Sequence, residues 1–213
     1  MSLLTIHRQL VKEGMSYTGA LAMVANMDAE SALLANNLQD CYNKAWGISD
    51  AEYCRRANAG NPTNGSCHFE NDGAGFGLYQ LTEASRKRGY YLVAREQWGV
   101  PIEDEECQVW YCCYEFRTQY KGLWKYLQRD DCDLETAVGR ICREFERPAE
   151  DNSGARYKRA ISRGQELEAL YAAEAEKTKP VSPAPLNLAA LSDRFRTLAS
   201  EFTDLADIFS KAK

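Results

Sequence analysis

Apolar residues follow Ser16 almost without interruption from residue 17 to residue 27. Serine is a common N-cap, and a helix that is apolar on nearly all sides is buried on most of them. We therefore predict that this segment is the central helix of the domain. Glu30 falls at its C-terminal end, where the apolar pattern stops.

Shorter segments with amphipathic spacing predict further helices along the chain. Residues 49–52 read Ser-Asp-Ala-Glu, which is a capping-box pattern, and Asp133 is a second clear helix start. Pro101 and Pro148 follow two of the segments and limit them. The expected helices cover residues 5–13, 49–56, 82–98, 104–120, 122–128, 133–145 and 153–172.

A single β signal interrupts this helical pattern. Residues 67–70 and 75–80 are short extended stretches, and residues 71–74 between them are turn formers. We predict a small hairpin, so the expected fold class is α+β and mostly α. Glycines at 73, 75 and 77 leave the backbone open to a ligand, although a tight hairpin alone would also explain them.

The composition changes near the C-terminus. Residues 177–185 are rich in proline, which predicts a stiff, extended linker. Beyond it, apolar residues recur at alternating spacings of three and four, as on the seam of a coiled coil: Leu188, Leu191, Phe195, Leu198, Phe202, Leu205 and Phe209. We expect a folded domain over 1–173, a linker over 174–187 and an amphipathic helix over 188–213. That helix needs a partner, which is the domain itself or, as the linker favours, a second copy or another protein.

Charge and hydropathy exclude some functions. The net charge is −5 and the pI is about 5.2, so there is no basic excess to bind nucleic acid in general. No apolar run reaches the roughly 18 residues of a transmembrane segment. The first residues read as an amphipathic helix and not as a signal peptide. We therefore expect synthesis in a cytoplasm without an export signal of its own.

Eight cysteines leave two interpretations open, disulfides or buried thiols. Cys41, Cys54 and Cys67 lie in a long, turn-rich region that a disulfide would staple. Cys54, Cys67 and His68 match no zinc-ligand spacing that we can defend. The sequence therefore predicts no metal and no cofactor.

Three motifs occur in a familiar order. They are Asn-Met-Asp-Ala-Glu-Ser at 26–31, Gly-Phe-Gly-Leu-Tyr-Gln-Leu-Thr at 75–82 with Arg86 after it, and Phe-Glu-Arg-Pro at 145–148. Together they resemble the phage tail-type lysozyme family of the lysozyme-like superfamily, over residues 3–172. The chain departs from the family at Ala25, where glycine is frequent, and at Leu81, where tryptophan is usual. The cysteine-bearing region after Glu30 is also longer than expected.

The resemblance implies a lysozyme-like fold and a glycoside hydrolase that cleaves β-1,4 bonds of peptidoglycan, with Glu30 as the general acid. Taken alone, the stretch around Glu30 favours an ordinary solvated residue at a helix end. A position half in the core would instead disfavour the charged carboxyl and keep it protonated near neutral pH. For the second carboxylate we expect Asp72, with Glu70 as the runner-up, because the hairpin turn should face the end of the central helix.

Residues of the glycine-rich stretch are the expected substrate-binding residues: Phe76, Tyr79 and Gln80. Glutamine suits hydroxyl and acetamido groups, and tyrosine offers a stacking face with a polar tip. Glu146 with Arg147 is interpreted as structural.

The sequence agrees with several functional hypotheses. The leading one is a phage endolysin or tail lysozyme that reaches the cell wall after release or delivery. A lytic transglycosylase or an antibacterial toxin would use the same site. A non-enzymatic assembly protein would keep the lysozyme-like domain only as a scaffold.

Overall fold

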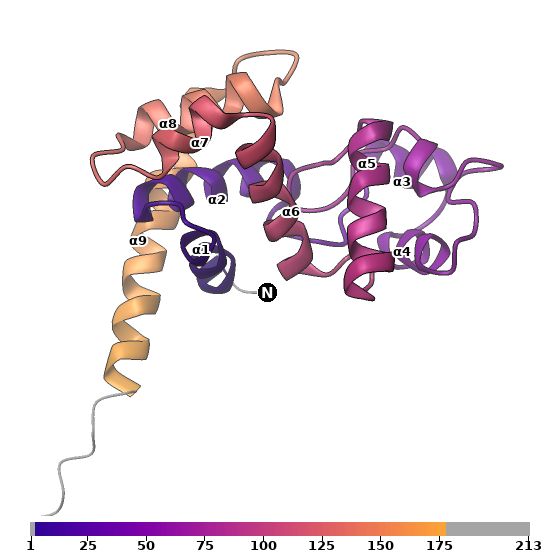
Figure 1. The fold of residues 1–213 in the computed structure, drawn as a ribbon, viewed down its shortest axis with the longest axis horizontal. Coiled ribbons are helices and arrows are strands. Elements are labelled where there is room, and N and C mark those ends of the chain that lie inside the picture. Colours follow the sequence, from indigo (N-terminus) through magenta and orange to yellow (C-terminus); the bar gives the residue numbers. More distant parts are fainter. Residues whose placement is uncertain (1–2, 178–213) are drawn as a thin grey trace, which may run out of the picture. The chain divides into compact units, whose positions relative to one another are not determined.

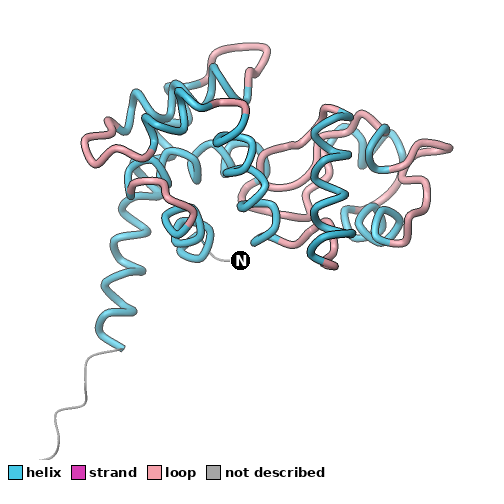
Figure 2. The backbone as a smooth tube through the Cα atoms, viewed as in Figure 1, coloured by secondary structure: helices cyan, strands magenta, loops and turns pink. Residues whose placement is uncertain are grey.

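The computed structural model describes residues 3–177, and the chain divides into two units, Met1–Glu174 and Ala175–Lys213. The first unit is mostly helical (Figure 2). Its helices are α1 (Leu3–Lys12), α2 (Tyr17–Ser31), α3 (Asp40–Trp46), α4 (Asp50–Asn58), α5 (Ala84–Tyr91), α6 (Glu105–Thr118), α7 (Lys121–Leu127), α8 (Leu134–Arg140) and α9 (Ser153–Lys177). The π-helical segments η2 (Leu92–Trp98) and η3 (Ile141–Glu146) extend α5 and α8, and η1 (Phe69–Asn71) is a short 3-10 turn.

Helix α2 is the centre of the fold, as the sequence predicts. It packs against α1, α7, α8 and η3 (Figure 1). The Ser16 hydroxyl accepts a hydrogen bond from the Gly19 amide at 3.0 Å and donates one to the Leu127 carbonyl oxygen at 2.9 Å. The N-terminus of α2 is therefore capped and joined to the end of α7 by one side chain.

Several helix starts follow the capping residues that the sequence marks. Ser49 accepts from the Glu52 amide, and Asp133 accepts from the Thr136 amide. Helix α3 was not predicted. It is short, it has no side-chain N-cap hydrogen bond, and it buries none of its residues, so its sequence carries no strong helical signal.

The predicted β-hairpin is absent from residues 3–177, where pairing is limited to isolated bridges. Phe76 pairs with the distant Leu38 and not with residues 67–70. The first expected strand forms η1 instead. In the turn between the two stretches, the Asp72 carboxylate is instead ion-paired with the buried Lys87 and accepts a hydrogen bond from the Ala74 amide.

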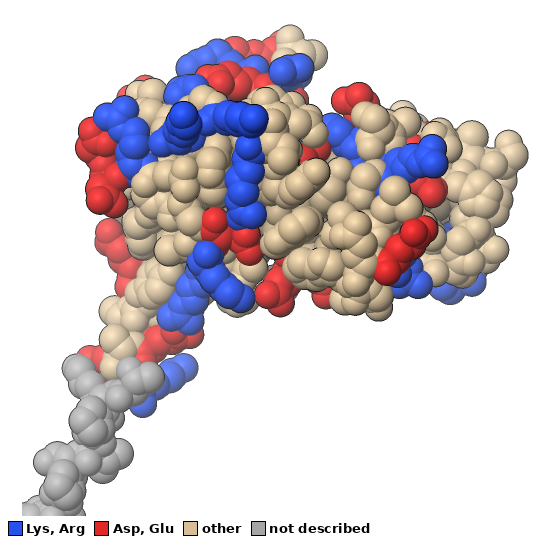
Figure 3. Space-filling model, viewed as in Figure 1, with Lys and Arg blue, Asp and Glu red and all other residues tan. Residues whose placement is uncertain are grey.

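All eight cysteines are unpaired thiols, which agrees with the thiol interpretation and not with the disulfide alternative. Cys41 is exposed and Cys67 half-buried, and the other six act as small buried side chains. Lys and Arg side chains are interspersed with Asp and Glu over the face shown in Figure 3.

Across the described range 3–177, no helix combines the length and apolar character that crossing a bilayer requires. Helix α9 continues to Lys177, a few residues into the predicted linker. The rest of that linker and the predicted C-terminal helix, with its proposed self-association, lie outside the described residues.

Candidate active site

The end of α2 turns sharply just after Glu30. Ala32 and Leu33 both adopt left-handed backbone conformations, with φ of 52° and 62°. The Ser31 hydroxyl contacts the carbonyl oxygens of Met27 at 3.0 Å and Leu78 at 2.9 Å. These contacts fasten the helix end to the glycine-rich stretch and leave Glu30 at the edge of a cavity.

This cavity has a volume of about 1060 Å³. Pockets for drug-sized ligands run to about 1,000 Å³, so it has room for an oligomeric ligand. Its lining comes from the end of α2, the start of α3, the segment around Gln80, the end of η3 and α9.

Backbone strain gathers around the cavity. Left-handed φ is rare in residues other than glycine and is frequent at functional sites. Ala32, Gln80 and Arg147 have φ of 52°, 47° and 49°, and all three line the cavity. The strained turns therefore support the cavity as the functional site.

Glu30 lines this cavity and is ion-paired with Arg156 of α9. The Glu30 side chain keeps 21% of its surface exposed, whereas that of Arg156 keeps 3%. Arg156 also donates to the Asn26 side-chain oxygen at 3.1 Å. The guanidinium therefore gives the Glu30 carboxyl a positively charged partner.

The nearby acid Asp28 is also ion-paired with arginines of α9. Arg163 donates to its carboxylate at 2.9 Å and Arg159 at 3.2 Å. Ion pairs therefore join the last turn of α2 to the first turns of α9, and Glu30 and Asp28 both line the cavity.

Glu146 is a buried acid that lines the same cavity. It is the last residue of η3, and the Arg147 amide closes that segment by donating to the Cys142 carbonyl oxygen at 2.8 Å. The Glu146 Oε1 atom is buried and has no hydrogen-bond partner. Burial, reinforced by the nearby Glu30 charge, raises the pKa of Glu146 to about 8. At neutral pH the Glu146 carboxyl is therefore mostly protonated.

Tyr79 and Gln80 line the same cavity. The Tyr79 hydroxyl is buried without a hydrogen-bond partner, and its ring packs on Phe145 at 5.8 Å between centroids. Gln80 donates to the carbonyl oxygens of Asn37 at 3.3 Å and Gly77 at 3.2 Å. Arg86 lies over the Tyr79 and Phe145 rings, and Glu115 neutralises it through two hydrogen bonds of 2.6 and 2.8 Å.

Phe76, the other expected substrate-binding residue, lies in the core. It is 1% exposed, and its ring contacts those of Tyr53 at 5.4 Å and Phe69 at 5.5 Å. It is not part of the cavity lining. A contact between Phe76 and substrate stays a prediction that its burial does not favour.

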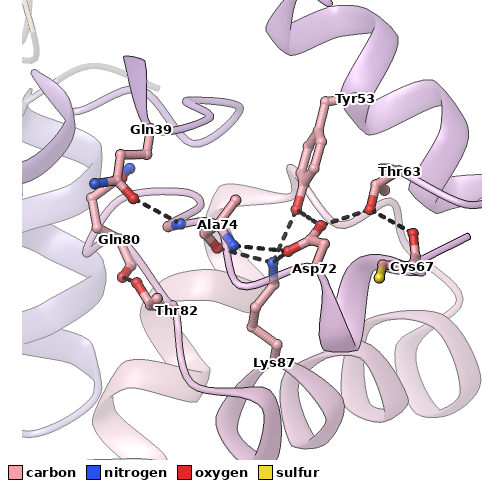
Figure 4. Close-up of polar contacts among 10 residues, drawn as sticks. Gln39, Tyr53, Thr63, Cys67, Asp72, Ala74, Gln80, Thr82 and Lys87 are labelled. Atoms are coloured by element: carbon pink, nitrogen blue, oxygen red, sulfur yellow. Dashed lines mark hydrogen bonds and ion pairs between the residues drawn. The ribbon is translucent and has the colours of Figure 1, made fainter. Parts of the chain in front are cut away.

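Asp72 is buried in a polar cluster of its own (Figure 4). Its carboxylate is ion-paired with Lys87 and accepts from Thr63 at 2.6 Å and from Tyr53 at 2.7 Å. Both charged side chains are fully buried, and Asp72 does not line the cavity. The catalytic role expected for Asp72 stays a prediction, and these contacts favour a structural role instead. The runner-up Glu70 is likewise not a lining residue.

Two residues of the site were not recognised from the sequence. Glu146 was interpreted as structural, and Arg156 was not singled out. The Phe-Glu-Arg-Pro motif was the available signal for Glu146. No group of three or more metal-binding side chains is found in the part of the chain that the structure describes.

The family model for phage tail lysozymes matches residues 3–165. This match confirms the resemblance that the three motifs indicate, and it spans Glu30, Glu146 and Arg156. Searches of curated proteins and of solved structures found no match.

Proposed function

Because this chain belongs to the phage tail lysozyme family, we propose that it is a peptidoglycan hydrolase that cleaves β-1,4 glycosidic bonds in this cavity. Glu30 is the general acid of the reaction. Tyr79 and Gln80 bind the glycan strand. The enzyme serves as a phage endolysin or tail lysozyme and acts on the cell wall after release or delivery.

One observation carries the proposal. The two buried side-chain oxygens that lack a hydrogen-bond partner within residues 3–177 are those of Tyr79 and Glu146, and both residues line the cavity with Glu30. Buried polar atoms in native proteins nearly always have partners. Unsatisfied buried oxygens beside strained backbone are typical of a functional site, and the cavity next to them has room for a glycan.

The chemistry of glycoside cleavage fits this arrangement. The leaving oxygen needs a proton, and the oxocarbenium-like centre needs nearby negative charge. Glu30 keeps part of its surface exposed to the cavity, so it can reach a bound glycosidic oxygen. Arg156 fixes the position of that carboxyl and supplies its counter-charge when the proton has left.

The test is digestion of purified peptidoglycan, followed by mass spectrometry of the products. We expect new reducing-end sugars from the parent protein and a loss of at least about 100-fold in Glu30→Gln, which cannot donate a proton. Glu144→Gln is the matched control, because Glu144 is exposed and ion-paired with Arg140. A parent protein without products would overturn the function and favour a non-enzymatic assembly role. Full activity in Glu30→Gln would overturn the assignment of Glu30.

A lytic transglycosylase is the second candidate. It needs no second carboxylate, because the sugar's own hydroxyl closes on the anomeric carbon. Asp72, the carboxylate expected for a hydrolase, is fully engaged with Lys87, Tyr53 and Thr63. The same digestion separates the two, since anhydro sugars mark a transglycosylase and reducing ends mark a hydrolase.

A further inference from the structure

We propose that Glu146 stores the proton that Glu30 delivers, so that the two carboxyls hold one proton between them beside the Arg156 guanidinium. This inference rests on the function proposed above. Glu146 is then a positioning residue, because it does not touch the substrate and acts on the reaction only through Glu30.

The charges around the cavity support a shared proton. The charged and titratable groups that act on Glu146 come from α2, α5, α6 and α9: Glu30, Arg86, Cys112, Glu115 and Arg156. Arg86 is paired with Glu115, and the arginines that follow Arg156 on α9 are paired with Asp28. Arg156 contacts Glu30, whereas the buried Glu146 Oε1 atom contacts no donor.

A second carboxyl without its own cation stays neutral in a buried site, because like charges and low polarity both disfavour ionisation. The pKa of Glu146, raised to about 8 by burial and by the nearby Glu30, agrees with this charge count. At neutral pH Glu146 is thus mostly a carboxylic acid.

The backbone holds Glu146 where this role needs it. A π-helical segment inserts an extra residue per turn, and such segments are frequent at functional sites. The left-handed Arg147, with φ of 49°, ends the segment directly before Pro148. A purely structural glutamate would have satisfied its Oε1 atom, whereas this one is left without a hydrogen-bond partner.

The proton balance is simple. Glu146 gives its proton to Glu30, directly or through one water, and Arg156 then compensates the Glu146 carboxylate. Glu30 passes the proton to the glycosidic oxygen as the bond to the anomeric carbon breaks. In hydrolysis, water adds its hydroxyl to that carbon, and its remaining proton returns to the carboxyl pair.

The first test is the pH dependence of kcat and KM in Glu146→Gln, with Glu144→Gln of the same segment as the control. We expect parent activity to fall above about pH 8, following the Glu146 carboxyl. In Glu146→Gln, Glu30 must take its proton from solvent. Its kcat should fall about 100-fold near pH 7 with little change in KM, and the alkaline limb should move to lower pH.

The second test detects the protonated carboxyl group directly and does not depend on enzymatic activity. Infrared spectra of the parent protein should show a protonated buried carboxyl at about pH 6.5 that disappears by about pH 9.5. Glu144→Gln should keep this band and Glu146→Gln should lack it. If Glu146→Gln does not fold, the parent titration alone decides.

Two results would overturn the inference. One is an active parent whose pH profile is unchanged in Glu146→Gln, and the other is a parent spectrum without a carboxyl band that titrates near pH 8. These results differ from the one that would overturn the proposed function. That result is a parent protein that releases no cleavage product.

Discussion

The buried acid Glu146 makes the folding stability of this protein fall as pH rises. Its pKa is about 8 in the folded protein, against 4.5 for an unperturbed glutamate. Between these values the folded protein holds a proton that the unfolded chain has released. The stabilisation is therefore fully present below about pH 4.5 and is lost as pH rises to about 8.

The size of this effect follows from the two pKa values. One pKa unit corresponds to about 1.4 kcal/mol, so the difference between about 8 and 4.5 corresponds to about 5 kcal/mol over the whole range. Between pH 5 and pH 7 the free energy of unfolding should fall by about 3 kcal/mol. Glu146→Gln should remove this slope, at a constant cost of about 1–3 kcal/mol for a buried amide without partners.

The measurement is urea unfolding of the parent and of Glu146→Gln at several pH values. The difference between the two proteins isolates Glu146, because other titrating groups such as the buried His7 are present in both. Burial lowers the pKa of His7, so its contribution has the opposite sign and is lost as pH falls. Equal slopes in the two proteins would refute the reasoning.

Three further predictions concern the rest of the domain. Lys87→Met should lower the free energy of unfolding by about 3–5 kcal/mol, because it leaves the Asp72 carboxylate buried without its cation, and adding Asp72→Asn should restore part of it in chemical denaturation. Gly19→Ala should destabilise the protein by about 2 kcal/mol in the same assay, although alanine favours helices, because the new Cβ would lie 2.2 Å from the Leu127 carbonyl oxygen; a stabilised variant would contradict the packing. A thiol reagent should label Cys41 first in the folded protein, and reductant should leave the intact mass unchanged; equal labelling of the buried cysteines would show that the core opens readily.

The sequence predicted those parts of the fold that local rules determine. The unbroken apolar run after Ser16 identified α2 as the central helix. Ser49, Asp104 and Asp133 marked helix starts because each side chain accepts from an amide three residues on. These features depend on neighbours in sequence, so a single chain is enough to predict them.

The parts that long-range contacts determine could not be predicted. Asp72 looked like a turn residue facing a cleft, but Lys87 binds it in the core, and the expected hairpin is absent from residues 3–177. Glu146 with Arg147 was interpreted as structural, but Glu146 ends a π-helical segment before a left-handed turn and lines the cavity. Local propensity indicates neither the ion pair nor the turn.

The ion pair between Glu30 and Arg156 joins residues 126 positions apart in the sequence. Contacts of such high sequence separation require a large loop to close first, which slows folding. Further contacts of this range fix α9 to α1, from His7 to Tyr171 and from Arg8 to Glu174. During synthesis, the carboxyl at the end of α2 therefore lacks its counter-charge until α9 has emerged from the ribosome. A chain that stops before Arg156 carries Glu30 and the whole glycine-rich stretch, yet it has no assembled site.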